Sequence, residues 1–90
     1  MAMRKILVAD DSLTIQKVIR LALSQEGYEI ETLGDGNALL QRLPVFRPDI
    51  VLIDISLPGR SAFEARRDTL RIPDLANVRW VLMSSAFDQV

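Results

Sequence analysis

The 90-residue chain contains no cysteine and no histidine, and these two absences exclude several kinds of chemistry. Without cysteine there can be no disulfide, no zinc–thiolate site and no thiol nucleophile. Without histidine there can be no Ser-His-Asp triad, no imidazole metal ligand and no phosphohistidine carrier. Any reactive or binding site must therefore be built without thiols and without imidazoles.

Long apolar runs and a strong net charge are also missing. The apolar stretch behind the basic pair Arg4-Lys5 ends at Asp10, which is too short for a signal-peptide core, and no other run approaches membrane-spanning length. A net charge of −1 provides no basic surface for nucleic acid. We therefore expect a cytoplasmic protein that makes no direct contact with membranes or nucleic acids.

The sequence does contain a regular alternation of apolar strands and amphipathic helices. An apolar fraction of 49% is enough to pack one small domain over residues 1–90, and the alternation favours a parallel α/β sheet. Strands are predicted at about 4–9, 28–33, 50–53 and 79–83, and helices from Ser12, from Asn37 to Leu43 before Pro44, and over about 61–70. The first helix is predicted to have one apolar face, made of Ile15, Val18, Ile19, Ala22 and Leu23.

Three acidic residues follow two of the apolar strands. Asp10 and Asp11 come after Ile6–Ala9, and Asp54 comes after Ile50–Ile53. In an open α/β sheet, ligands bind beyond the carboxyl ends of the strands, so these carboxylates are expected to share one pocket. Three close negative charges repel one another unless a cation lies among them, and oxygen-only ligands suit Mg²⁺. The sequence thus predicts a magnesium site.

These residues, in order, resemble the receiver domain of two-component response regulators. The resemblance rests on Asp10-Asp11-Ser12, on the segment from Asp54 to Gly59 (Asp-Ile-Ser-Leu-Pro-Gly), and on Ser85-Ala86 after the fourth strand. It implies a flavodoxin-like, doubly wound parallel sheet with strand order 2-1-3-4, followed in complete members by a fifth strand and further helices.

The resemblance also implies a role for each matching residue. Asp54 matches the phosphoacceptor, and Asp11 and Asp10 match the direct and the largely water-mediated Mg²⁺ ligands. The backbone carbonyl of Ser56 matches a further ligand, and Ser85 matches the switch hydroxyl that bonds the phosphoryl group. The implied function is a signalling module, not a substrate-turning enzyme, that accepts a phosphoryl group from a histidine kinase or phosphotransfer protein. Its downstream partner cannot be read from the sequence.

One residue of the family pattern has no counterpart. The family has a lysine at the end of a fifth strand, but this chain has only Lys5, at the start of the first strand, and Lys17, in the first helix. We therefore expect an incomplete receiver, ending after the fourth strand, whose last strand has an open edge. Either the sequence is a piece of a longer receiver, or the edge pairs with a second copy in a strand- or domain-swapped homodimer.

Two other functions compete with phosphorylation. A pseudo-receiver would keep the fold as a phosphorylation-independent interaction module, which the absent lysine favours and the intact set of Asp10, Asp11, Asp54 and Ser85 opposes. A phosphohydrolase of the haloacid dehalogenase kind would need Asp-x-Asp after its first strand. Neither Asp10-Asp11-Ser12 nor Asp54-Ile55-Ser56 has that spacing, so this alternative is disfavoured.

Overall fold

The computed structural model describes residues 4–84 and contains one four-stranded sheet. The strands are β1 (Lys5–Ala9), β2 (Glu29–Leu33), β3 (Ile50–Asp54) and β4 (Arg79–Met83). All neighbouring pairs are parallel and the order is β2-β1-β3-β4. This confirms the predicted flavodoxin-like order 2-1-3-4, and within the described residues β4 forms one edge of the sheet.

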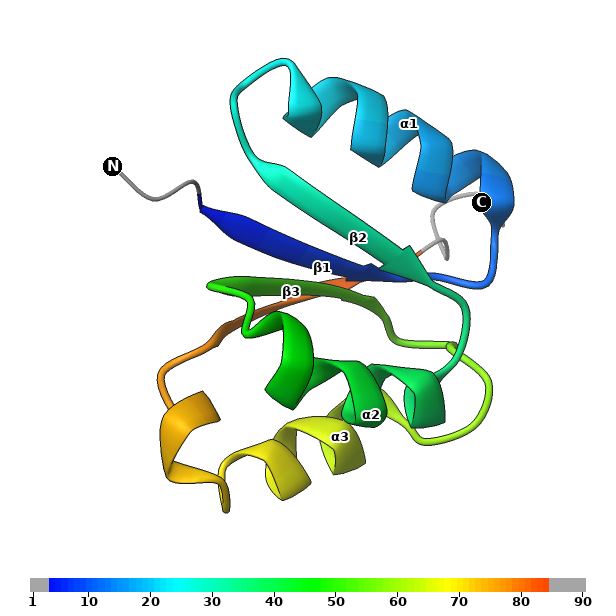
Figure 1. Cartoon of the computed structure of the whole chain (residues 1–90). Helices are drawn as coiled ribbons and strands as arrows, with labels where there is room; N and C mark the ends of the chain where they lie inside the picture. The colour runs from blue at the N-terminus through cyan, green and yellow to red at the C-terminus, as the bar shows by residue number, and fades with distance from the viewer. Residues whose placement is uncertain (1–3, 85–90) are drawn as a thin grey trace.

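Helices cover both faces of this sheet. The chain forms α1 (Leu13–Ser24), α2 (Gly36–Phe46), α3 (Ala62–Thr69) and a short 3₁₀ helix, η1 (Pro73–Leu75). Figure 1 shows α1 on one face, with α2 and α3 together on the other. The arrangement is therefore doubly wound. None of the helices in the described part of the chain has the length and apolar character needed to cross a lipid bilayer.

The main core lies between the sheet and the pair α2–α3. Alternate residues of the two central strands point into it, as the two-residue period of a strand requires. Leu7 and Val51 are fully buried there, together with Leu39 and Leu43 of α2. Burying such side chains contributes about 1.5–3 kcal/mol each, so this layer holds the two central strands firmly in register.

The layer under α1 is thinner. Ile6, Val8 and Ile30 are buried, but the helix contributes only the half-buried Ile19 and Leu23 to their cluster. The predicted apolar face of α1 is thus only partly confirmed. The remaining three of its predicted residues, Ile15, Val18 and Ala22, are exposed.

The boundaries predicted for α2 are wrong at both ends. The N-cap is Asp35, not Asn37: its carboxylate accepts a hydrogen bond from the backbone N–H of Ala38 at 2.8 Å. The helix also does not stop before Pro44 but continues to Phe46, whose ring is buried against the core. Burial of Phe46 offsets the backbone hydrogen bond that Pro44 cannot donate.

Candidate functional site: an acidic pocket at the carboxyl edge of the sheet

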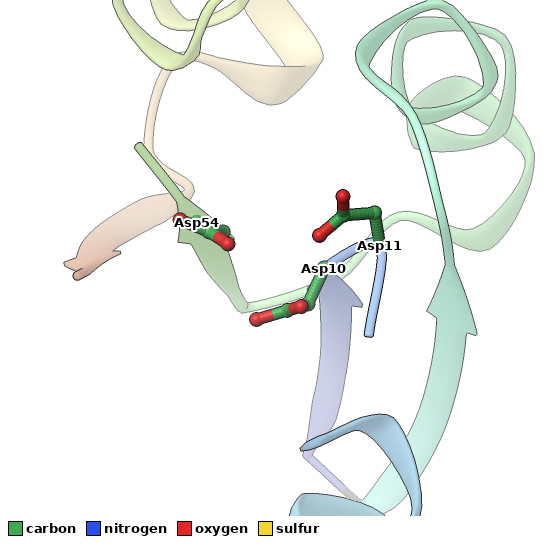
Figure 2. Close-up of side chains that lie close together, drawn as sticks. All are labelled: Asp10, Asp11 and Asp54. Carbon is green, nitrogen blue, oxygen red and sulfur yellow. The ribbon is translucent and has the colours of Figure 1, made fainter. Parts of the chain in front are cut away.

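Three carboxylates converge where β1 and β3 end. Ala9 pairs with Ile53 across the sheet, so the residues that follow, Asp10 and Asp54, emerge side by side. Asp11 is the next residue after Asp10, and one carboxylate oxygen from each of the three lies within 4.8 Å of the others. Figure 2 shows the side chains of Asp11 and Asp54 turned toward each other at the ends of the two strands. The three carboxylates are therefore brought together in the structure, as predicted.

The three carboxylates concentrate negative charge at a site that is partly shielded from solvent. Asp10 and Asp54 are each only 6% exposed, whereas Asp11 is exposed. Burial raises the pKa of Asp10, the backbone N–H of Ser12 lowers it, and the charges of Asp54 and Asp11 raise it again. Within residues 4–84, no arginine or lysine forms an ion pair with any of these three carboxylates.

Local hydrogen bonds orient the two buried carboxylates. Oδ1 of Asp10 accepts from the backbone N–H of Ser12 at 2.8 Å, and Ser12 is the N-cap of α1. Oδ1 of Asp54 accepts from both the backbone N–H of Ser56, at 3.0 Å, and its hydroxyl, at 2.9 Å. Among the described residues no hydrogen bond engages Oδ2 of Asp54. One oxygen of Asp54 is thus held in place while the other remains available to a ligand.

The donor set suits a hard divalent cation. Its three side chains offer carboxylate oxygens, and the chain has no thiol or imidazole that could add a softer ligand. Mg²⁺ accepts one or two carboxylates and keeps several waters, and the exposure of Asp11 opens the site to solvent. A divalent cation here would also offset the burial and the repulsion from Asp54 and Asp11 that together raise the pKa of Asp10.

The remaining predicted site residues divide into one that is close and one that is not described. Ser56 lies two residues after Asp54 and bonds it through its side chain as well as its backbone N–H. This hydroxyl contact was not predicted from the sequence, because the family resemblance implies a role only for the carbonyl of Ser56. Its sequence signal is a hydroxyl residue two positions after an aspartate, which commonly folds back on it. Ser85 lies outside the described residues.

Neither lysine of the chain serves the pocket. Lys5 lies at the opposite end of β1, where its ammonium donates to the carbonyl of Phe46 at 3.3 Å. Lys17 lies on the exposed side of α1. This agrees with the expectation that neither fills the place of the family's lysine.

Comparison with known protein families shows to which family the chain belongs. The sequence model of the response regulator receiver domain matches residues 6–89, which is nearly the whole chain. The chain belongs to the response regulator receiver family. Receivers are modules of two-component signalling, and phosphorylation and magnesium binding are typical of the family.

Solved receivers support the assignment. The chemotaxis response regulator CheY4 of Vibrio cholerae superposes with a TM-score of 0.85 at 25% identity, over 98% of this chain and 76% of that protein. The receiver domain of a sensor histidine kinase from Pseudomonas aeruginosa, solved with magnesium in its active-site cleft, gives 0.84 at 26% identity over 94% and 70%. A receiver protein of Methanoculleus marisnigri shares the fold, with a TM-score of 0.79 at 22% identity over 98% and 90%.

Proposed function

We propose that this receiver accepts a phosphoryl group on Asp54 from a histidine kinase or phosphotransfer protein. The observation that carries the proposal is the state of Asp54 in the acidic pocket. Its Oδ1 is fixed by two hydrogen bonds from Ser56, while its Oδ2 has no such partner within residues 4–84. A carboxylate needs no general base to act as a nucleophile, so positioning and charge neutralisation are the main requirements.

The transfer step is a substitution at phosphorus. A carboxylate oxygen of Asp54 attacks the phosphorus atom and forms an acyl phosphate bond. The bond from phosphorus to the donor breaks, and its electron pair leaves with the donor group. The same residue later returns to the free carboxylate by hydrolysis, so the protein itself carries the group and turns over no separate substrate.

Mg²⁺ is the proposed cofactor of this step. Asp10, Asp11 and Asp54 would hold it together with the backbone carbonyl of Ser56, and their oxygen-only chemistry fits that ion. The bound ion would neutralise charge on the pocket and on the transferred group. The magnesium in the active-site cleft of the related Pseudomonas receiver supports this assignment.

Ser85 is proposed as the switch hydroxyl that donates to the phosphoryl group. A new dianion at Asp54 would recruit such a donor, and the resulting change of surface would be read by a downstream partner. We place this activity in the cytoplasm, where phosphodonor kinases act.

A pseudo-receiver remains the second candidate. The observation in its favour is that neither Lys5 nor Lys17 lies at the carboxylates. Such a module would bind its partner equally well whether or not a phosphodonor is supplied.

The test is phosphorylation of the purified chain. Incubation with Mg²⁺ and acetyl phosphate is expected to add the mass of one phosphoryl group, and Asp54→Asn or a chelator is expected to remove the increment. Asp49→Asn, an exposed aspartate at the other end of the sheet, is the matched control and should retain it. If no increment forms even when a longer chain supplies the family's fifth strand and lysine, the pseudo-receiver is favoured.

A further inference from the structure

The loop between β3 and α3, which follows Asp54, is in contact with the turn between β2 and α2. The backbone N–H of Gly36, the first residue of α2, donates to the carbonyl of Pro58 at 2.9 Å. Gly36 is buried, and the backbone of Arg60 lies directly beside it. The β2–α2 turn therefore meets the β3–α3 loop, backbone against backbone.

This contact tolerates no side chain at position 36. A Cβ added to Gly36 would lie 2.0 Å from the carbonyl oxygen of Arg60 and 2.8 Å from its N and C atoms. Because these are backbone atoms, no rotamer change can relieve the overlap. The two loops would have to separate by about 1 Å or more, a displacement large enough to disorder a preorganised site.

The contacted loop is the one that carries Ser56. Leu57, between Ser56 and Pro58, is buried in the core, and its N–H donates to the carbonyl of Asp54 at 3.1 Å. Ser56 is thus fixed on one side by its bonds to Asp54 and on the other by the contact of Pro58 with Gly36. A shift of Pro58 is transmitted to Ser56 over two peptide units.

We propose that Gly36 is a positioning residue for the Mg²⁺ site: its missing side chain lets the β3–α3 loop hold Ser56 beside Asp54. This inference rests on the proposed function, since it assumes that the pocket binds Mg²⁺ with help from Ser56. Gly36 itself touches neither the ion nor the phosphoryl group. It acts through Pro58 and Arg60, as outer-shell groups act on metal ligands.

The test compares two glycine substitutions two residues apart. In Gly36→Ala the new methyl group meets Arg60, whereas in Gly34→Ala it meets nothing within 4 Å. Titration calorimetry with MgCl₂ on the folded protein is expected to give a dissociation constant about tenfold higher for Gly36→Ala. Gly34→Ala should keep the wild-type value. A Gly36→Ala protein that melts earlier but binds Mg²⁺ as the wild type does would overturn the inference, because Gly36 would then be purely structural.

A second variant keeps the test available if Gly36→Ala does not fold. In Gly59→Ala the new Cβ would lie 3.2 Å from Nδ2 of Asn37 and 3.3 Å from the backbone N of Gly36, and the φ of 84° at position 59 strains an alanine there, so this variant loosens the same contact from the loop side. A rise of severalfold in the dissociation constant is expected, and an unchanged value would overturn the inference. A wild-type protein that binds no Mg²⁺ would defeat the proposed function as well, so the two failures are distinguishable.

Discussion

The buried charge of Asp10 suits the binding of a cation but lowers the stability of the metal-free protein. Its carboxylate is buried, and the charges of Asp54 and Asp11 add to the cost of ionising it. The N–H of Ser12 offsets part of that cost. A carboxylate whose ionised form is destabilised in this way is typical of a site organised to bind a ligand.

Removing the charge of Asp10 should stabilise the protein in the absence of metal. Because the pKa of Asp10 is raised on folding, the folded state binds more protons than the unfolded state between the two pKa values. The contribution of Asp10 to the free energy of unfolding is therefore fully present below about pH 3.8, the ordinary pKa of an aspartate. It is lost as the pH rises through the raised pKa of the folded state. Asp10→Asn should raise the melting temperature by a few degrees at pH 7 without metal, and by less near pH 4.

Added Mg²⁺ should reverse this advantage. The ion is expected to raise the melting temperature of the wild type but scarcely that of Asp10→Asn. Asp49→Asn is the control, because Asp49 is exposed and far from the pocket. Equal melting temperatures for wild type and Asp10→Asn at every pH would contradict the expected cost of burying the Asp10 charge beside Asp54 and Asp11.

At this scale the sequence predicted the acids but not the contacts that hold them. Asp10, Asp11 and Asp54 follow strands, and the carboxyl ends of neighbouring parallel strands meet by topology alone. The hydroxyl bond from Ser56 to Asp54 and the backbone contact at Gly36 depend on loop conformation. Loop conformation is set by packing between distant segments, so neither contact follows from spacing.

Among the elements, α2 departs furthest from its sequence pattern. Proline inside a helix costs about 3 kcal/mol, yet Pro44 lies within α2. Phe46, two residues later, is 4% exposed in the main core, and the N–H of Arg47 closes the last turn on the carbonyl of Leu43 at 2.9 Å. Tertiary burial has overridden local preference here. The central strands β1 and β3 are short apolar runs whose burial is already encoded in the sequence, and they were predicted to within a residue.

Replacing the proline should strengthen the helix. Pro44→Ala restores a backbone donor at an exposed position, and some of the gain is offset because proline also stiffens the unfolded chain. The expected increase in the free energy of unfolding is about 1–2 kcal/mol, measured by urea denaturation. Val45→Ala, at a neighbouring exposed position, should change it by about 0.5 kcal/mol at most. A neutral or destabilising Pro44→Ala would show that the helix is not strained at this point.

On the scale of the whole molecule, the sheet is covered unequally. The face under α2 and α3 has a continuous core, whereas the face under α1 has only a small cluster of buried residues. On β4, Val81 and Leu82 are 46% and 48% exposed, and no strand within residues 4–84 pairs with its outer edge. Such an edge invites pairing with another chain.

The 90-residue chain is therefore expected to dimerise through β4. Light scattering should give a dimer at micromolar concentration, and Val81→Lys should shift it toward monomer because an edge lysine opposes strand pairing. Val45→Lys adds the same charge at an exposed apolar position of α2, away from the sheet edge, and should leave the dimer intact. A compact wild-type monomer over the whole concentration range would contradict this expectation.

The most direct test of the central claim is the position of the phosphoryl group. After reaction with Mg²⁺ and acetyl phosphate, borohydride reduces an acyl phosphate of aspartate to homoserine, which marks the acceptor permanently. Trypsin separates Asp10 and Asp11, in the peptide Ile6–Lys17, from Asp54, in Leu43–Arg60. Homoserine at position 54 alone is the predicted result. Homoserine at position 10, 11 or 49 in place of 54 would contradict the assignment of Asp54 as the acceptor.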